Sequence, residues 1–421
     1  MCMTAGHLKR CTKMAFALAV TLAVSPAVAA PTKAQVESQY RNWIEKDLWP
    51  EAKEAGVSRA VFDQAFAGVS INWKLPDLVI PGETPSTPKA QKQAEFGAPG
   101  KYFNARTVSA VTSGGQARYG QYASLLKRIE RKYGVPGQIL LAVWGRESGF
   151  GTVKIPYNVY EVLGTKAYLA TRKDMFRKEL IAALEIVSKG YIDESGMKSS
   201  WAGALGQPQF MPTSYLKHAV DFDGDGKRDI WNSVPDTLGS IANYLKLHGW
   251  QKGRDWGFEV NVPPAISCSL EGPDQGRAIA EWAKLGITRI SGKPFPANEL
   301  RGEGFLLMPA GRYGPAFIVT PNFYVLKDYN MSDLYALFIG HVGDRIAYGA
   351  GDFQTRWGNV GSMYRSDILA MQKRLQAHGH DVGKADGLPG FKTRRSIGLW
   401  QTQNGTAPTC FPQPELLKII R

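Results

Sequence analysis

Cysteine is scarce in this chain, with only four among 421 residues. Cys2 and Cys11 lie in an N-terminal segment that we expect to be removed, which leaves Cys268 and Cys410. In an oxidising compartment two cysteines can pair, and such a bond would tie the C-terminal segment to the main domain. Two free, buried thiols fit the sequence almost as well, so the sequence leaves the pairing open.

A long apolar run is also missing. The run from Met14 to Val24 follows three basic residues and precedes a stretch of small residues that ends at Ala30. It is too short to span a bilayer comfortably, and the whole pattern is typical of a secretory signal peptide. No cysteine follows it in a lipidation context, so we see no lipobox. We predict a signal peptide at 1–29 and a periplasmic mature chain without a transmembrane span.

Acidic residues are fewer than basic ones. The chain has 51 Lys and Arg against 37 Asp and Glu, a formal net charge of +14. Removal of the three basic residues of the signal peptide leaves 14 − 3 = +11. A basic surface favours an anionic partner such as nucleic acid, an acidic membrane or an anionic cell-wall polymer. Export argues against nucleic acid, although simple solubility also explains a basic balance.

The sequence has no long internal repeat and no low-complexity tract, but it has enough apolar residues for a real core. Hydrophobic residues make up 44% of the chain, and its length suggests two or three domains. The predicted boundaries are a main domain at 30–348, a Gly-rich linker at 349–361 and a small helical module at 362–421. The helical and short strand-like patterns lie at 35–66, 119–132, 136–147, 173–189, 235–248, 278–285, 305–308, 316–320 and 332–346.

Glu147 lies at the end of a predicted helix that begins at Pro136, a residue suited to a first helical turn. It follows Val143 by four residues and Trp144 by three, so it occupies the next place on an apolar face. Gly149 then favours termination of the helix. Partial burial and the negative end of the helix dipole both raise the pKa of a carboxyl group, as a general acid requires. A glutamate with its carboxylate in water is the plainer alternative.

The segment 200–215 is rich in small and polar residues. Glycines let the backbone approach a ligand closely. Ser200 offers a hydroxyl group, and Gln209 offers both a donor and an acceptor. Phe210 and its aromatic neighbours can line a groove that fits the face of a sugar. The structural alternative is a Gly-rich loop packed on a helix.

The segment 221–229 matches the spacing of an EF-hand calcium loop. Acids occupy positions 1, 3, 5 and 9, and a glycine occupies position 6. Position 12 is Asn232 instead of the usual glutamate, but Asp236 lies a little further on and would close the site. A polar turn capped by aspartates is the alternative. The predicted ligands of a structural Ca²⁺ are Asp221, Asp223, Asp225, Asp236 and the backbone carbonyl of Lys227.

Together these motifs resemble the lytic murein transglycosylase B family. The resemblance runs from about Tyr40 to Ile346 and is carried by 144–151, 202–215, 220–231 and 240–245. Four motifs in the family's order are far more specific than any one of them. The tail resembles the peptidoglycan-binding module often attached to cell-wall enzymes, through Asp386-Gly387, Gly390 and Thr393-Arg394.

The resemblance implies an α+β, predominantly α fold. Its parts would be a lysozyme-like catalytic core, a small β-containing subdomain, an EF-hand-like loop and a C-terminal helical module. Glu147 matches the family's single catalytic acid/base. The substrate-contacting positions implied by the resemblance are Ser200, Gln209, Phe210, Tyr244, Tyr329 and Tyr335.

The implied reaction is cleavage of the MurNAc-β-1,4-GlcNAc bond of peptidoglycan with formation of 1,6-anhydroMurNAc ends. The implied partners are glycan strands and cell-wall synthesis or remodelling proteins, with no organic cofactor. A lysozyme-type muramidase is one alternative; hydrolases of that kind use two carboxylates, and Asp193 and Glu194 are available although nothing marks either as the second. A non-catalytic peptidoglycan-binding protein is the other alternative.

Overall fold

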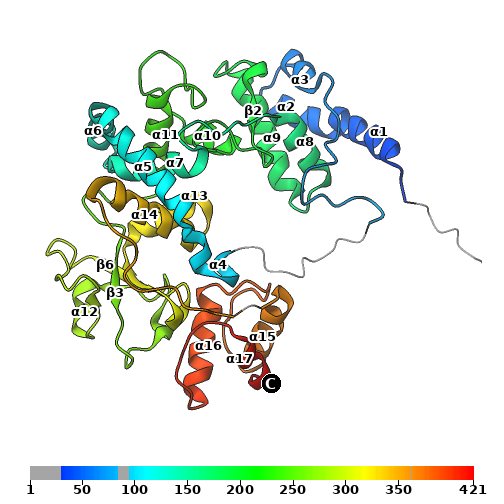
Figure 1. The fold of residues 1–421 in the computed structure, drawn as a ribbon. Helices are drawn as coiled ribbons and strands as arrows, with labels where there is room; N and C mark the ends of the chain where they lie inside the picture. The colour runs from blue at the N-terminus through cyan, green and yellow to red at the C-terminus, as the bar shows by residue number, and fades with distance from the viewer. Residues whose placement is uncertain (1–29, 84–93, 362) are drawn as a thin grey trace, which may run out of the picture.

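The computed structural model describes residues 30–83, 94–361 and 363–421. The predicted signal peptide at 1–29 lies outside these residues. Within them, no helix combines the length and the apolar character that a bilayer crossing demands. The described chain forms a mainly helical upper part, a small sheet and a C-terminal helical module (Figure 1).

An N-terminal lobe combines the first helices with two later ones. Its aromatic core joins Tyr40 to Tyr168 and Phe62 to Phe66. In Figure 1 the early helices, in blue, lie beside the green pair α8 and α9. The helices of the lobe are α1 (Lys33–Trp43), a π-helical turn (Ile44–Leu48), α2 (Trp49–Glu54), α3 (Arg59–Phe66), α8 (Val159–Leu169) and α9 (Lys173–Ser188).

The central helical bundle surrounds α7 (Gly137–Ser148), which is buried along most of its length. Close packing needs small residues here: a Cβ at Gly145 would lie 2.6 Å from the Phe150 ring and 2.7 Å from Val111. The other helices of the bundle are α5 (Ala105–Gln121), α6 (Ala123–Tyr133), α10 (Pro212–His218), α11 (Val234–Leu247), α13 (Pro321–Asn330) and α14 (Asp333–Tyr348).

A five-stranded antiparallel sheet with the order β4-β6-β7-β3-β5 forms the small β-containing subdomain. The inward faces of its strands pack on α12 (Ile279–Lys284) through Ile279 and Trp282, both fully buried. The strands are β3 (Gly257–Asn261), β4 (Arg277–Ala278), β5 (Thr288–Arg289), β6 (Glu303–Leu307) and β7 (Ala316–Val319). A two-stranded pair, β1 (Tyr157–Asn158) with β2 (Lys198–Ser199), lies apart from it.

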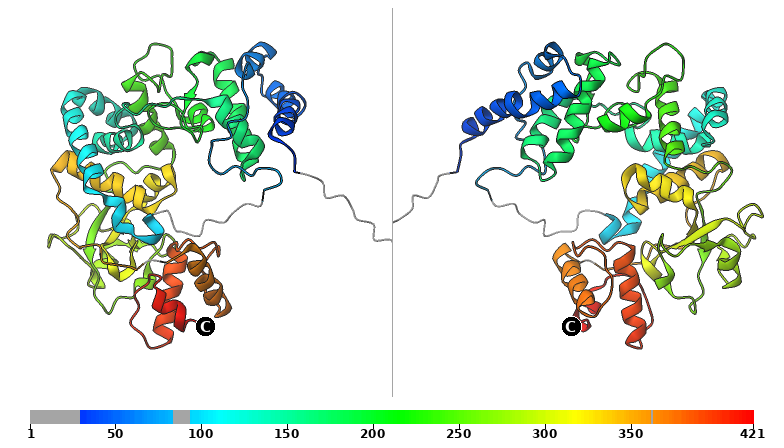
Figure 2. Two further views of the ribbon diagram at one scale, coloured as in Figure 1. Left: turned by 45° about the vertical axis from the view of Figure 1, so that its right-hand side comes forward. Right: turned by 180° about the vertical axis from the view of Figure 1, so that it is seen from behind.

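The C-terminal module has its own small core, which includes Met371, Leu375 and Ile397. A disulfide between Cys268 and Cys410, with an S–S distance of 2.02 Å, ties the module to the β-containing subdomain. The question that the sequence left open is therefore answered in favour of pairing. Both views of Figure 2 place the module beside that subdomain and at the opposite end of the molecule from α1–α3. Its helices are α15 (Arg365–Ala377), α16 (Phe391–Gln403) and α17 (Pro414–Ile419).

The predicted linker at 349–361 lies along the surface of the core. Trp357 stacks on Phe103 with 5.4 Å between ring centroids, and Phe353 packs on His341. The backbone N–H of Thr355 donates to the Glu259 carboxylate at 2.7 Å. These contacts hold the connection against the main domain along much of its length.

Candidate active site

Helix α7 brings Glu147 to the end of a buried face. The helix stops at Gly149, which adopts the left-handed conformation with φ 56°. Glu147 is half-buried, and burial raises the pKa of its carboxyl group to about 7. A hydrogen bond from Tyr335 and the charge of Arg146 act in the opposite direction. The carboxyl group can therefore hold a proton near neutral pH, as the sequence predicted from its position.

Tyr335 is the hydrogen-bond donor to Glu147. Its hydroxyl group donates to Oε1 of the carboxylate at 2.6 Å. Tyr335 lies in the first turn of α14, where its backbone N–H donates to the side chain of the N-cap residue Ser332 at 3.2 Å. The start of α14 thus fixes the only side chain that bonds to the Glu147 carboxylate among the described residues.

Three further predicted substrate residues extend from Tyr335 as a series of aromatic rings. Tyr329 stacks on Tyr335 at an interplanar angle of 11°, with 6.1 Å between centroids. Tyr244 lies 4.8 Å from Tyr329, and Phe210 lies 5.7 Å from Tyr244. The structure therefore brings side chains from α11, α13, α14 and the Gly-rich loop into one aromatic array next to Glu147.

The hydroxyl groups of this array are fixed by the backbone. Tyr329 donates to the carbonyl of Pro208 at 2.8 Å, and Tyr244 donates to the carbonyl of Asp328 at 3.0 Å. Burial raises the pKa of both phenols, and for Tyr329 the charge of Glu147 raises it further. The two tyrosines stay neutral at physiological pH, so they offer rings and hydroxyl groups and no negative charge.

Ser200 and Gln209 shape the loop with their own side chains. The Ser200 hydroxyl accepts from the backbone N–H of Ala204 at 3.2 Å. Gln209 has a positive φ of 55°, and its amide donates to the carbonyl of Gly206 at 2.8 Å. Both side chains are half-buried. The polar groups that the sequence offered to a ligand are therefore partly used to hold the loop.

Gln207 is a structural link that the sequence reasoning missed. Its carbonyl oxygen accepts from the Trp144 indole at 2.7 Å, and its amide donates to the carbonyl of Trp231 at 2.8 Å. A Cβ at Gly151 would lie 2.5 Å from its side chain. Gln207 thereby ties the Glu147 helix to the Gly-rich loop. No pattern in the sequence separates it from its neighbour Gln209.

A second carboxylate does not bond to Glu147 in the described part of the chain. Asp193, one of the two acids available in the sequence, lines a cavity of about 190 Å³ together with Lys227, Asp229 and Asn232. The side chain of Glu194 lies outside what the structure describes. The site as described has one carboxyl group held by one phenol.

The acidic loop gathers four of the five predicted metal ligands. Carboxylate oxygens of Asp221, Asp223, Asp225 and Asp236 all lie within 4.8 Å of one another. Asp236 comes from the first turn of α11 and is fully buried. The position-9 acid, Asp229, instead accepts from the backbone N–H groups of residues 231 and 232. Asp236, and not the position-9 acid Asp229, is therefore the fourth carboxylate of the cluster.

The donor set of this loop fits a hard cation. Lys227 lies in the turn, where its backbone N–H donates to Asp225 at 2.8 Å. The Asp221 carboxylate accepts from the N–H groups of Gly224 and Gly226, which lowers its pKa. Burial raises the pKa of Asp236, although two backbone N–H groups donate to it. Several carboxylate oxygens at close range form the kind of donor set that Ca²⁺ takes in proteins.

Comparison with known proteins begins with a family described as "Transglycosylase SLT domain", whose model matches residues 39–344. A curated relative, the membrane-bound lytic murein transglycosylase B of Escherichia coli, is 32% identical over 231 residues. The match covers 54% of this chain and 62% of that relative. The chain thus spans less than two thirds of the length of this relative.

Solved structures extend the similarity over more of the chain. SltB3 from Pseudomonas aeruginosa, in complex with NAG-anhNAM-pentapeptide, is 37% identical and has a TM-score of 0.81. The same protein in complex with NAG-NAM-pentapeptide gives a TM-score of 0.82, and each comparison covers 91% of this chain and 99% of that one. Escherichia coli SLT35 in complex with calcium is 30% identical over 61% of this chain and 80% of that one, with a TM-score of 0.51.

Proposed function

This chain belongs to the SLT-domain transglycosylase family, and from that premise we propose that it is a lytic transglycosylase of peptidoglycan. It cleaves the MurNAc-β-1,4-GlcNAc bond and leaves 1,6-anhydroMurNAc ends. The observation that carries the proposal is a half-buried carboxyl group at Glu147, with a pKa of about 7 and one phenolic partner. Similarity to SltB3, which is described in complex with NAG-anhNAM-pentapeptide, supports the anhydro product.

In the first step protonated Glu147 donates its proton to the glycosidic oxygen. The bond between that oxygen and C1 of MurNAc breaks, and positive charge develops at C1. The hydrogen bond from Tyr335 stabilises the carboxylate that Glu147 becomes. The proton and the leaving group thus depart together as the free hydroxyl group of GlcNAc.

In the second step the carboxylate of Glu147 takes the proton of the C6 hydroxyl group of the same MurNAc. Oxygen O6 forms a bond with C1, which closes the anhydro ring and returns Glu147 to its protonated form. The nucleophile belongs to the substrate, so its attack is intramolecular and has a large proximity advantage. A second carboxylate that activates water, as in inverting hydrolases, is not required.

The aromatic array next to Glu147 is proposed to hold the glycan strand. Apolar faces of sugar rings pack well on aromatic rings. Tyr244 and Tyr335 are buried and Tyr329 is half-buried, and hydrogen bonds fix all three hydroxyl groups. Phe210 completes the apolar side of the array. Ser200 and Gln209 would bind polar groups of the sugars with the donor and acceptor capacity that the loop leaves free.

The acidic loop is proposed to hold a structural Ca²⁺ through Asp221, Asp223, Asp225, Asp236 and the carbonyl of Lys227. Clustering of the four carboxylates supports this proposal, as does similarity to SLT35, described in complex with calcium. When bound, the ion would neutralise the repulsion among the carboxylates at the start of α11. Its role is to stabilise the helix that carries Tyr244, so no step of the reaction passes through it.

The remaining assignments rest on the sequence patterns. We propose a catalytic domain at 30–348, a connection at 349–361 and a peptidoglycan-binding module at 362–421. The signal-peptide pattern and the proposed cell-wall substrate support a periplasmic location for the mature protein. Its partners are peptidoglycan glycan strands, together with cell-wall synthesis or remodelling proteins.

Mass spectrometry of the products from purified sacculi tests the function. Wild type is expected to release anhydro-ended muropeptides, and Glu147→Gln should reduce their formation by roughly a thousandfold or more, as loss of a sole acid/base does. Glu185→Gln is the matched control, because it changes only an exposed pair with Lys189 on α9. Reducing ends, heavier by one water, would instead identify a hydrolase. If the wild-type protein leaves the sacculi intact, the result would favour the alternative of a non-catalytic peptidoglycan-binding protein.

A further inference from the structure

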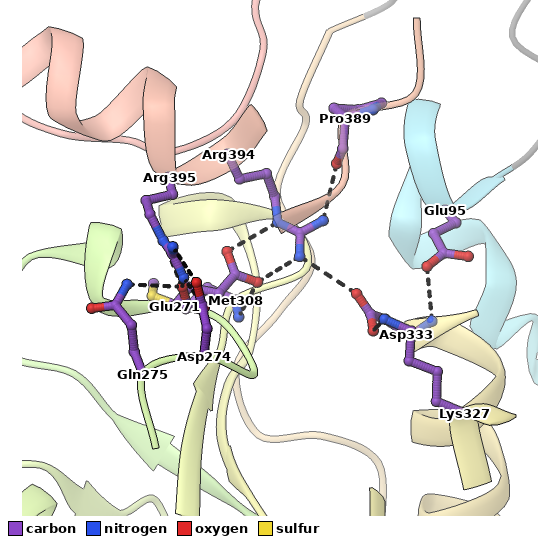
Figure 3. Close-up of polar contacts among 10 residues, drawn as sticks. All are labelled: Glu95, Glu271, Asp274, Gln275, Met308, Lys327, Asp333, Pro389, Arg394 and Arg395. Atoms are coloured by element: carbon purple, nitrogen blue, oxygen red, sulfur yellow. Dashed lines mark hydrogen bonds and ion pairs between the residues drawn. The ribbon is translucent and has the colours of Figure 1, made fainter. Parts of the chain in front are cut away.

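A buried ion cluster connects the C-terminal module to the helix that holds Tyr335. We call it the junction cluster, and Figure 3 shows it. Its members come from five elements that are distant in sequence: α4 (Ala94–Gly97), the loop after a 3-10 turn (Cys268–Leu270), α13, α14 and α16. The charged residues of the cluster are Glu95, Glu271, Lys327, Asp333 and Arg394.

Arg394 is the centre of this cluster. Its guanidinium group forms a bidentate pair with Glu271, at 3.0 Å through Nε and 2.5 Å through Nη2, and Nη1 donates to the carbonyl of Pro389 at 3.1 Å. Glu271 is fully buried, and Arg394 is 1% exposed. The guanidinium group therefore already has a full carboxylate partner within the β-containing subdomain.

Arg394 also reaches the start of α14. Its Nη2 lies 3.5 Å from Oδ2 of Asp333, the first residue of that helix. The other oxygen of Asp333 pairs with Lys327 at 2.8 Å. Figure 3 shows Asp333 between the guanidinium group on one side and the lysine on the other. One cation of the module and one of α13 thus hold the same carboxylate from two directions.

Glu95 adds a third carboxylate to the same helix end. It accepts from the backbone N–H of Asp333 at 2.9 Å and from the hydroxyl group of Ser332. Burial and the charge of Asp333 raise the pKa of Glu95, while Arg394 lowers it. The cluster has three carboxylates against two cations. Without the charge of Arg394, the carboxylates at the start of α14 would repel one another in a buried environment.

The first turn of α14 carries this arrangement to the active site. Ser332, held by Glu95, caps the backbone N–H of Tyr335, and Asp333 lies two residues before Tyr335. Tyr335 in turn donates to Glu147 at 2.6 Å. A small shift of the helix end therefore changes the distance between a phenol and the carboxyl group that carries the proton.

We propose that Arg394 of the C-terminal module is a positioning residue for the transglycosylase site. Through Asp333 it holds the start of α14 so that Tyr335 keeps its hydrogen bond to Glu147. The inference rests on the proposed function for its effect on turnover, but the geometry at Glu147 can be measured without turnover. The module then has a task in the reaction besides binding to the cell wall.

Asp333→Asn is the main test variant, because it leaves the buried pair between Arg394 and Glu271 intact. Two variants serve as comparisons. Lys327→Met removes the Lys327–Asp333 pair alone, which Asp333→Asn also breaks, so the difference between them reports the contact with Arg394. Arg395→Gln removes the neighbouring arginine of α16, which pairs with Asp274 and does not reach Asp333.

The first readout is the pKa of Glu147, measured in the full-length protein by NMR titration of ¹³C-carboxyl glutamate. The Glu147→Gln spectrum assigns the resonance. Complete loss of a hydrogen bond to a charged group moves a pKa by about 1 to 2 units, so we expect a rise of roughly half that in Asp333→Asn. Lys327→Met should give a smaller rise, and Arg395→Gln should leave the wild-type value of about 7.

The second readout is the rate of anhydro-product formation from soluble glycan fragments. Asp333→Asn should lower kcat roughly tenfold with little change in KM, since misplacement by about 1 Å costs up to a hundredfold. If Asp333→Asn does not fold, Arg394→Lys takes its place, because the shorter lysine keeps a cation for Glu271 without reaching Asp333.

The outcomes separate the two proposals. An unchanged Glu147 pKa in both Asp333→Asn and Arg394→Lys overturns the positioning role, whatever the activity. Equal shifts in Asp333→Asn and Lys327→Met assign the effect to α13 and also overturn it. Absence of anhydro products from the wild type contradicts the proposed function alone, since the titration still reports whether the module sets the geometry at Glu147.

Discussion

Glu147 and Glu271 are both glutamates withdrawn from solvent, yet they have opposite surroundings. Glu271 receives a bidentate arginine and, at 3.1 Å, the backbone N–H of Met308. Glu147 receives one phenol, and Arg146, whose charge lowers its pKa, donates at 3.2 Å to Tyr102 instead. The two carboxyl groups share a burial effect and differ in what compensates for it.

The difference separates a structural carboxylate from one that can exchange protons. Burial raises the pKa of Glu271, and the bidentate arginine acts in the opposite direction, because protonation of the carboxylate would leave the cation unpaired. A carboxyl group with one neutral partner holds its proton near neutral pH and can release it. Burial alone therefore does not show that a carboxyl group can exchange protons. The hydrogen-bond and ion-pair partners of the group must be considered as well.

Glu271→Gln should have the largest effect on stability. It leaves Arg394 buried with only Asp333 as a charged partner, and broken buried pairs cost about 3–5 kcal/mol. The measurement is urea unfolding with the disulfide intact. Asp274→Asn is the matched control, because it breaks the more exposed pair with Arg395 and should cost less than about 1 kcal/mol. Equal losses in the two variants would show that Glu271 is no more critical than a surface acid.

Tyr335→Phe should have the next largest effect, on catalysis. The ring stays stacked on Tyr329, but the hydrogen bond to the Glu147 carboxylate is lost, and kcat should fall about 10- to 100-fold. The proposed reaction needs protonated Glu147, so activity of the wild type should fall as pH rises through about 7. Loss of the donor raises the pKa further, so the alkaline limb of the kcat profile should move to higher pH.

Tyr313→Phe is the control for this change. It removes one phenol hydrogen bond, from Tyr313 to Gln413 at 2.8 Å, far along the chain from Glu147. Its kcat and its alkaline limb should match the wild type. An alkaline limb that moves to lower pH in Tyr335→Phe would contradict the role of this hydroxyl group as a donor to the carboxylate.

Calcium binding to the acidic loop should have the smallest effect on stability. This loop adds to the comparison a group of carboxylates that we propose to be neutralised by a metal ion in place of an arginine. Calcium at about a hundredfold excess over its Kd should stabilise the protein by about 2.7 kcal/mol, seen as a rise of a few degrees in Tm. Asp225→Asn should abolish most of this rise, whereas Asp193→Asn, outside the group of four, should keep it. A Tm that is the same in calcium and in chelator would remove the ion from the proposal.

The helix that carries Glu147 could be predicted from the sequence because the patterns that indicate it are local. Apolar periodicity and a terminating glycine are both contained within fifteen residues, and α7 forms as predicted. Helix α5 was missed, since Gly114 and Gly115 lower its helix propensity. Tertiary packing explains their presence: a Cβ at Gly115 would lie 2.3 Å from Ile346. Helices α8 and α13 were also not predicted.

The site could be predicted only in part for a similar reason. The tyrosines of the array came from family resemblance, and their contacts are long-range: Tyr335 meets Glu147 across 188 positions. No periodicity connects such residues. The junction cluster was not predicted at all, because a lone Glu271 or Arg394 has the sequence appearance of an ordinary surface charge.

The junction cluster joins parts of the chain that are far apart in sequence. Arg394 follows Glu271 by 123 residues, and Cys410 follows Cys268 by 142. Without α16, the β-containing subdomain has a carboxylate that it cannot bury without a large penalty. A chain that lacks α16 therefore leaves the buried Glu271 carboxylate without its guanidinium partner. We therefore expect the β-containing subdomain and the C-terminal module to unfold together, because each buries a charge that the other neutralises.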